Sequence, residues 1–490
     1  MARRRRNPYP GLVVAALVPA LVLGSCWRFA DGRTPDEVAV PTGDPGAGTA
    51  GSGESAVVTP LETPLLSVRR SPAVLSRDAN ATAFRADLQP LLDSIDSTSC
   101  VAVSIDGQPV AAVNDTLSLR PASNVKLITA AVALEALGPE FVYTTTVNGE
   151  VGAGGVVSGD VYLVGGGDPL LSSSWWKGPN QKFPPFNVTA IESLADAVKA
   201  AGVTAITGSV VGDSSRYDDE WYLPTWSDSL RFTEGGPLSA LLLNDSREAV
   251  DRSSNDPVIG AALVFTQLLQ ERGITVGGPP AEGKNTGAPE IASLDSQPLP
   301  AVLQEMLTTS DNNTAELLLK EVGLHSGGAG TTEAGLSVVM DSLEQWGIPL
   351  DGVTLVDGSG LSDENRATCA ALLAVAQHGS VDDAVGEGLP IGGQQGGTLY
   401  DAFQEGEPLS GIIRAKTGTL DNTDGLPDKP GTKALTGYVP QAGGGAIEFS
   451  LLLNGETITN KTEYRPIWEL FATTLAAYPS GPTPDQLAPR

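Results

Sequence analysis

The chain has 490 residues, a length that predicts about three domains. Its 41% hydrophobic and 18% charged residues supply enough apolar sequence for a large core, which excludes a wholly disordered chain. A net charge of −28 would repel phosphate backbones, so we exclude a nucleic-acid-binding protein. The two histidines, His325 and His378, and the three cysteines match no zinc-site spacing. We expect both histidines at the surface, which argues against a serine–histidine–aspartate triad.

The N-terminus has the pattern of a targeting segment. Four arginines at residues 3–6 precede an apolar core from Gly11 to Gly24. Three alternatives stay open: an uncleaved membrane anchor, a lipoprotein whose lipobox-like sequence ends at Cys26, or a cleaved signal peptide. Each places the rest of the chain outside the cytoplasm, in the cell envelope. We therefore predict a signal or anchor over residues 1–30 and a flexible linker rich in Pro, Gly, Ser and Thr over residues 31–64.

The folded body begins near residue 65, and its predicted helices and strands follow no regular βαβ alternation. A β-hairpin is expected at 100–113, with its turn at Asp106-Gly107. Further strands are expected at 141–164, 206–211, 412–416 and 446–454. Helices are expected at 84–94, 123–138, 191–201, 257–272, 299–309, 314–322, 367–377 and 464–477. This mixture predicts an α+β fold.

The first candidate catalytic pair is Ser123 and Lys126, at the start of an apolar helix that Gly138 ends. A spacing of three places both side chains on one helix face, one turn apart. The positive end of the helix dipole favours a developing alkoxide, and a buried lysine of lowered pKa can accept the serine proton. A second Ser-x-x-Lys match, at 174–177, lies between serine, glycine and proline residues with no long helix after it, and we interpret it as a loop.

Two further motifs follow in the sequence. Ser310-Asp311-Asn312 precedes a predicted helix, where a hydroxyl can relay a proton and an amide can hold a substrate carbonyl; an N-cap alone would also explain these residues. Lys416-Thr417-Gly418-Thr419 ends a predicted apolar strand, where lysine and hydroxyls can bind a carboxylate and glycine lets a ligand lie along the strand edge. The order Ser-x-x-Lys, Ser-x-Asn, Lys-Thr-Gly is the signature of the penicillin-binding and serine β-lactamase superfamily.

From about residue 72 to 477 the chain resembles the low-molecular-mass class C penicillin-binding proteins, which are D-alanyl-D-alanine carboxypeptidase/endopeptidases. The segments that carry this resemblance include PASNVKLITAAVALEALG (121–138), LVGGGDPLL (163–171), DGSGLS (357–362) and RAKTGTL (414–420). The long gap between Ser123 and Ser310 resembles the family's insertion between its first two motifs. The chain departs from the family at Asp363, where an arginine is common, and at 421–433, which we expect to form an extra loop that narrows or gates the groove.

The resemblance implies an α+β, β-lactamase-like transpeptidase domain with a five-stranded antiparallel sheet packed by helices. This DD-peptidase domain would comprise residues 65–142 and 294–477, with an inserted accessory region at 143–293 and a C-terminal tail at 478–490. The resemblance also implies the site: Ser123 as nucleophile, Lys126 as base, Ser310 and Asn312 as proton-relay and amide-binding groups, Lys416, Thr417, Gly418 and Thr419 as the carboxylate-binding strand, and the backbone N–H groups of Ser123 and Thr419 as the oxyanion hole.

The implied reaction is acyl transfer from a peptide ending in D-Ala-D-Ala to Ser123, followed by hydrolysis. The implied partners are peptidoglycan stem peptides and β-lactam antibiotics as covalent inhibitors, with membrane contact only through the N-terminus. No metal and no organic cofactor is expected. A serine β-lactamase, a non-enzymatic penicillin receptor and a generic secreted binding protein are the competing functions. The balance of carboxypeptidase, endopeptidase and transpeptidase activity stays open.

Two expectations concern single residues. Cys100, in a predicted strand, and Cys369, in a predicted helix of the same domain, are either free or paired. Lys126 is expected to have a lowered pKa because of its apolar surroundings and the helix N-terminus, and because of repulsion from Lys416, which the resemblance places across the groove.

Overall fold

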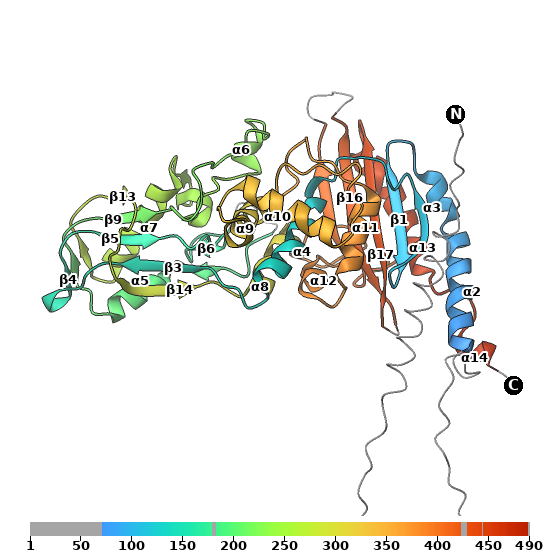
Figure 1. Ribbon diagram of the computed structural model, residues 1–490, viewed down its shortest axis with the longest axis horizontal. Coiled ribbons are helices and arrows are strands. Elements are labelled where there is room, and N and C mark those ends of the chain that lie inside the picture. The colour runs from blue at the N-terminus through green and yellow to red at the C-terminus, as the bar shows by residue number, and fades with distance from the viewer. Residues whose placement is uncertain (1–70, 179–182, 423–428, 443, 489–490) are drawn as a thin grey trace, which may run out of the picture. The chain divides into compact units, whose positions relative to one another are not determined.

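The computed structural model describes residues 71–178, 183–422, 429–442 and 444–488 (Figure 1). All of them belong to one compact unit, Leu66–Arg490. The predicted targeting segment and linker lie outside the described residues. In the part of the chain that is described, no helix is both long and apolar enough to span a membrane.

The first large sheet is antiparallel and has the strand order β15-β16-β17-β1-β2. Asp106 and Gly107 form the turn between β1 and β2 with φ angles of 48° and 73°, a left-handed conformation that glycine adopts without steric cost. The predicted hairpin is therefore confirmed. The five strands are β1 (Cys100–Ile105), β2 (Gln108–Val113), β15 (Arg414–Leu420), β16 (Gly431–Pro440) and β17 (Ala446–Gly455).

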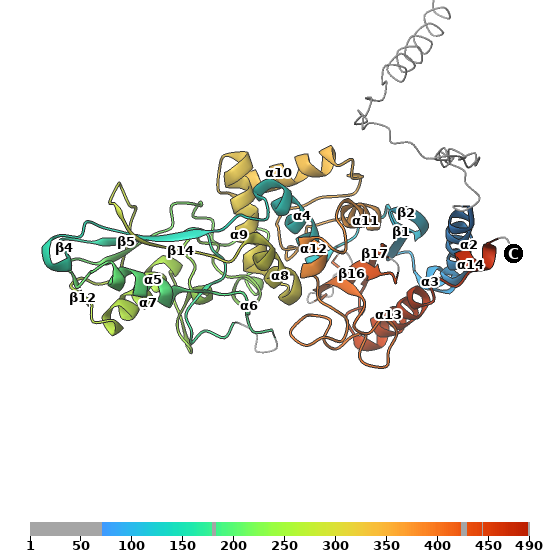
Figure 2. The ribbon, with the colours of Figure 1, turned by 90° about the horizontal axis from the view of Figure 1, so that it is seen from below.

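Helices cover both faces of this sheet, so that in Figure 2 β17 lies between α11 and α13. Successive residues of β17 point to opposite faces: Leu452 packs in one core and Leu451 and Leu453 in the other. The first layer contains α4 (Val125–Leu137), α8 (Leu299–Thr309), α9 (Asn312–Val322), α10 (Thr332–Gln345), α11 (Cys369–His378) and α12 (Ala384–Gly388). The second contains α2 (Ser71–Asp87), α3 (Gln89–Ser94) and α13 (Lys461–Ala476), and α14 (Pro484–Leu487) contacts α2. The α+β class and the helix-packed five-stranded sheet are confirmed.

Residues 144–295 form a second region with sheets and a core of its own. Its larger sheet has the order β13-β9-β5-β3-β14 and is mixed, and a small parallel sheet has the order β12-β8-β4. Two amphipathic or apolar helices, α5 (Ile191–Ala200) and α7 (Pro257–Glu271), complete the core. The strands are β3 (Thr144–Asn148), β4 (Val156–Val157), β5 (Val161–Val164), β8 (Ala205–Ile206), β9 (Val210–Asp213), β12 (Thr275–Val276), β13 (Ala281–Glu282) and β14 (Glu290–Asp295). Shorter elements are β6 (Leu171–Ser172), β7 (Thr189–Ala190), α6 (Leu230–Thr233), β10 (Arg247–Ala249) and β11 (Arg252–Ser253).

Three predicted boundaries near the sequence motifs are wrong. Helix α9 begins at Asn312, two residues early, because the Asp311 carboxylate accepts the Thr314 N–H and acts as the N-cap. Strand β15 continues to Leu420, so the Lys-Thr-Gly motif lies inside the strand; backbone pairing with β16 tolerates its polar side chains. Residues 431–433 belong to β16 and not to the predicted loop.

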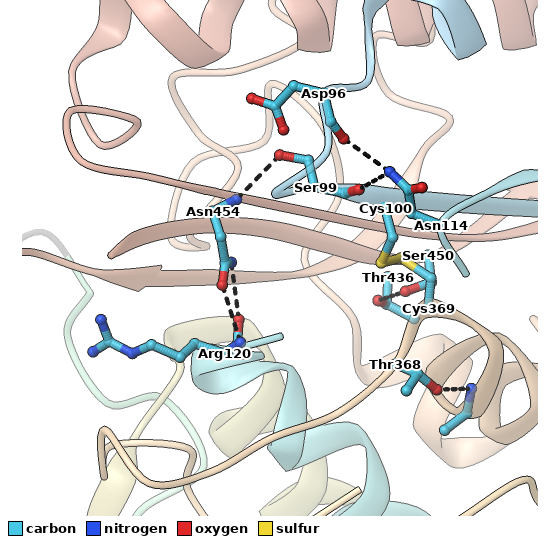
Figure 3. The surroundings of a disulfide bond; sticks show 11 residues. Asp96, Ser99, Cys100, Asn114, Arg120, Thr368, Cys369, Thr436, Ser450 and Asn454 are labelled. Carbon is cyan, nitrogen blue, oxygen red and sulfur yellow. Dashed lines mark hydrogen bonds between the residues drawn. A yellow bond between two sulfur atoms is a disulfide. The ribbon is translucent and has the colours of Figure 1, made fainter. Parts of the chain in front are cut away.

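A disulfide joins Cys100 on β1 to Cys369 at the start of α11 (Figure 3). Both residues are fully buried and their Cα atoms are 6.1 Å apart. Of the two alternatives that the sequence left open, the structure therefore contains the pair.

Candidate active site

Ser123 lies in a short 3₁₀ turn, Ala122–Asn124, that leads directly into α4. Two glycines allow this turn to approach its neighbours closely. A Cβ on Gly418 of β15 would lie 2.9 Å from Asn124 Nδ2, and a Cβ on Gly360 would lie 1.9 Å from the Ala122 carbonyl oxygen. The turn is thereby held between the sheet edge and the DGSGLS segment, with Ser123 half-buried.

Lys126 is fully buried one turn further along α4. Its Nζ lies 3.1 Å from Ser123 Oγ, 2.6 Å from Asn312 Oδ1 and 2.7 Å from the Ser359 carbonyl oxygen. Burial lowers the pKa of Lys126 to about 8, against the opposing effect of nearby carboxylates, of which Glu316 is the strongest. The expected lowering is present, and it places the neutral amine within reach at mildly alkaline pH.

Ser310 and Lys416 meet on the other side of the site. Ser310 ends α8 in a left-handed conformation, with φ at 66°, and its Oγ accepts a hydrogen bond of 2.8 Å from Lys416 Nζ. Lys416 is fully buried, and burial together with the charge of Lys126 lowers its pKa well below the usual value. The predicted repulsion between the two lysines is therefore present, and it lowers the pKa of Lys416.

Both polar atoms of the Asn312 side-chain amide are hydrogen-bonded. Its Oδ1 accepts from Lys126, and its Nδ2 donates to the Glu234 carbonyl oxygen at 2.7 Å. Glu234 follows α6 in the region between the first two motifs, and sequence reasoning missed it because a backbone carbonyl leaves no residue-type signal. A cavity of about 640 Å³ opens here, with Ser310, Asn312 and Trp176 in its wall.

The remaining predicted substrate-binding residues line β15. Thr417 Oγ1 donates to Thr398 Oγ1 at 2.8 Å, and Thr419 Oγ1 accepts from Lys433 Nζ at 2.9 Å. Gly418 packs against the turn that carries Ser123, which brings β15 beside the start of α4. All the predicted site residues are therefore brought together in one place.

The second Ser-x-x-Lys match, Ser174 to Lys177, lies in a loop after β6, as expected. Both residues are exposed, and Lys177 Nζ donates to the backbone carbonyl of Ser174 at 2.9 Å rather than to its hydroxyl. Both histidines are also exposed, as predicted; His378 stacks on Trp346 with ring centroids 3.9 Å apart.

Comparison with known proteins identifies the family. Residues 85–251 and 244–474 match the model of the D-Ala-D-Ala carboxypeptidase 3 (S13) family. The chain belongs to this family. It is 30% identical to carboxypeptidase DacB of Mycolicibacterium smegmatis over 94% of this chain and 95% of that one. It is 28% identical to a D-alanyl-D-alanine carboxypeptidase of Actinomadura sp. strain R39 over 84% of this chain and 88% of that one. The predicted family and enzyme class are confirmed: the S13 protein is a hydrolase, a D-Ala-D-Ala carboxypeptidase with an extracytoplasmic role.

The fold of the S13 carboxypeptidase is similar to that of penicillin-binding protein 4 of Haemophilus influenzae. The TM-score is 0.62 at 22% identity, covering 79% of this chain and 98% of that one. The H. influenzae protein has also been solved in complex with a β-lactam.

Asp363, at which the sequence departs from the pattern that the resemblance implied, has a clear structural role in this carboxypeptidase. Its carboxylate pairs with Arg120, whose side chain is 2% exposed, and lies 3.5 Å from Lys429 Nζ. Arg120 also donates to the carbonyl of Pro430. Asp363 therefore holds the start of β16 against the segment that precedes Ser123.

Proposed function

We propose that the S13 carboxypeptidase cleaves the D-Ala–D-Ala bond through an acyl-enzyme on Ser123, with Lys126 as the general base. The observation that supports this most directly is the 3.1 Å separation of Lys126 Nζ and Ser123 Oγ, with burial lowering the lysine pKa to about 8. Ser123 Oγ attacks the carbonyl carbon of the penultimate D-alanine while its proton moves to Lys126 Nζ. The C–N bond then breaks, D-alanine leaves with a proton, and water hydrolyses the ester.

The other site residues have complementary roles in this proposal. The backbone N–H groups of Ser123 and Thr419 stabilise the oxyanion, since Gly418 lets the two segments approach closely. Lys416, with the hydroxyls of Thr417 and Thr419, binds the terminal carboxylate. Ser310, hydrogen-bonded to Lys416, relays the proton to the leaving amine, and the Asn312 amide binds the acyl-side carbonyl.

Two further activities belong to the same proposal. A penicillin carries a carboxylate beside a reactive amide carbonyl, so it would acylate Ser123 as a substrate does. Endopeptidase cleavage of cross-linked stem peptides is supported by the cavity of about 640 Å³ beside Asn312, which offers space next to the catalytic residues for part of a second peptide.

We also propose a domain division and an attachment for the enzyme. Residues 65–142 and 294–477 would form the peptidase domain and 143–293 the accessory region, supported by the second region's separate sheets and core. The arginine-rich N-terminus and the apolar stretch after it would direct the chain to the cell envelope, as an anchor, a lipoprotein or a cleaved signal.

The test is labelling with a fluorescent penicillin, followed by D-alanine release from a synthetic pentapeptide and cleavage of a cross-linked dimer. Stable labelling with D-alanine release supports the proposal, and cleavage of the dimer supports the endopeptidase activity. Rapid turnover of the penicillin without D-alanine release would instead identify a β-lactamase.

A further inference from the structure

The hydrogen bonds around Lys126 determine where its lone pair points. A neutral lysine amine has two N–H groups and one lone pair. Asn312 Oδ1 and the Ser359 carbonyl oxygen, at 2.6 and 2.7 Å, can only accept hydrogen bonds. When the two N–H groups donate to these oxygens, the lone pair is left for the Ser123 hydroxyl at 3.1 Å. The position of the Ser359 carbonyl is therefore as important for proton transfer as that of Asn312.

Glu316 holds the segment that presents this carbonyl. Its carboxylate accepts the Gly358 N–H at 3.1 and 3.0 Å and the Ser359 N–H at 2.8 Å. Glu316 is fully buried on α9, one turn after Asn312, so one helix sets both acceptors of Lys126. Thr129 Oγ1, on α4, donates to the Gly358 carbonyl oxygen at 2.7 Å. The segment 358–359 is therefore held by α9 through its N–H groups and by α4 through a carbonyl.

A salt bridge does not account for the burial of Glu316. Within the described residues, no ion pair includes Glu316, although a buried carboxylate is destabilising without a compensating charge. The neighbouring Asp357 closes the turn, because it accepts the N–H groups of Gly360 and Ser362 and the indole N–H of Trp226. The carboxylate of Glu316 is thus directed at the two N–H groups next to the Ser359 carbonyl.

We propose that Glu316 is a positioning residue for the base: it fixes the Ser359 carbonyl on Lys126 and so directs the lysine lone pair at Ser123. This inference rests on the proposed function, in which Lys126 is the base. It also gives Glu316 an electrostatic effect, since its negative charge opposes the effect of burial on the pKa of Lys126. The other charged groups that face Lys126 are Asp311, Asp357, Glu234 and Lys416.

The experiment compares Glu316→Gln with Glu321→Gln. Glu321 is a second buried glutamate on α9, but it binds Arg216 and Tyr217. For Glu316→Gln we expect kcat for D-alanine release to fall about tenfold, with KM within threefold, because the amide has one acceptor oxygen instead of two and holds the Gly358 and Ser359 N–H groups less strongly than the carboxylate does. Burial and Asp357 raise the pKa of Glu316 to about 8. Glu316 therefore becomes negatively charged in the same pH range in which Lys126 loses its proton. Loss of that charge should lower the pKa of Lys126, so the acylation rate should rise at lower pH than in the wild type. Glu321→Gln should leave this pH profile unchanged.

Thr129→Val provides a second variant in case Glu316→Gln folds poorly. It removes the hydrogen bond to the Gly358 carbonyl without changing charge, so kcat should fall several-fold while the pH midpoint stays unchanged. Wild-type activity in both variants, or a fall in rate that only parallels a loss of thermal stability as in Glu321→Gln, overturns the inference. Ser123→Ala separates this failure from failure of the proposed function, because an active Ser123→Ala enzyme refutes the acyl-enzyme itself.

Discussion

The two Ser-x-x-Lys tetrapeptides of this enzyme have the same spacing but very different surroundings. Lys126 is fully buried on a helix and contacts three oxygens from three separate segments. Lys177 is exposed in a loop and contacts the backbone of its own tetrapeptide. A serine hydroxyl needs a desolvated base held in a fixed direction, so the spacing of the motif contributes chemistry only where the fold supplies burial and second partners.

The largest difference between the two tetrapeptides is expected when each serine is replaced by alanine. Ser123→Ala should abolish penicillin labelling and reduce D-alanine release by on the order of 10³-fold or more, because no covalent intermediate can form. The fold should persist, since the hydroxyl of a half-buried groove residue contributes little to stability. Ser174→Ala is the matched control and should behave as the wild type. Labelling that persists in Ser123→Ala, or moves to Ser174, would refute the assignment.

The second-largest loss of activity is expected when the lysines of the two tetrapeptides are replaced. Lys126→Arg should lower the second-order rate of penicillin acylation by about 10²–10⁴-fold, because a guanidinium does not deprotonate and cannot accept the serine proton. Lys177→Arg should have no effect. In the wild type the rate should rise with pH through an apparent pKa near 8, since burial lowers the pKa of Lys126 to that value and the neutral form is the base. Near-wild-type acylation in Lys126→Arg would require another base.

Lys416 is expected to differ from Lys126 in its role, because it binds substrate and does not accept a proton. Lys416→Ala should mainly weaken recognition of the substrate carboxylate, lowering kcat/KM by roughly 10–100-fold, the range expected for a lost hydrogen bond to a charged group. A substrate with an amidated C-terminus should lose much less, because it has no carboxylate to bind. Equal losses for both substrates would assign Lys416 a different role.

The smallest effect on activity is expected at the disulfide, which lies in the same core as α4. Cys369→Ala should lower the free energy of unfolding by about 2–5 kcal/mol through the lost cross-link, with D-alanine release nearly unchanged at 25 °C. Denaturant unfolding of the variant and of wild type measures the difference. Unchanged stability would show that the core holds α11 without the bond.

The sequence predicted those parts of the enzyme that depend on residue type and local pattern. The motif residues from Ser123 to Thr419 were identified because each carries its own chemistry, and the hairpin and most helices because their apolar periodicity is clear. The α9 boundary was wrong because Ser310 and Asp311 divide between two helices, one as a C-cap and the other as an N-cap.

Other features depend on contacts across long sequence separations. The Glu234 carbonyl and the Glu316 carboxylate act through backbone groups, and neither stands in a recognisable pattern. The pairing of Cys100 with Cys369 depends on a Cα separation that only the folded chain defines.

The disulfide also determines what proteolysis can do to the enzyme. The bond joins residues 269 positions apart, so it closes a covalent ring that contains Ser123, Ser310 and all of the region from 143 to 293. A single cut anywhere within the ring opens it but leaves the two fragments joined. Nicked enzyme should therefore migrate as one species on a gel without reductant and separate into two only after reduction. The two halves of the catalytic site would thus stay tethered even when the accessory region has been cleaved.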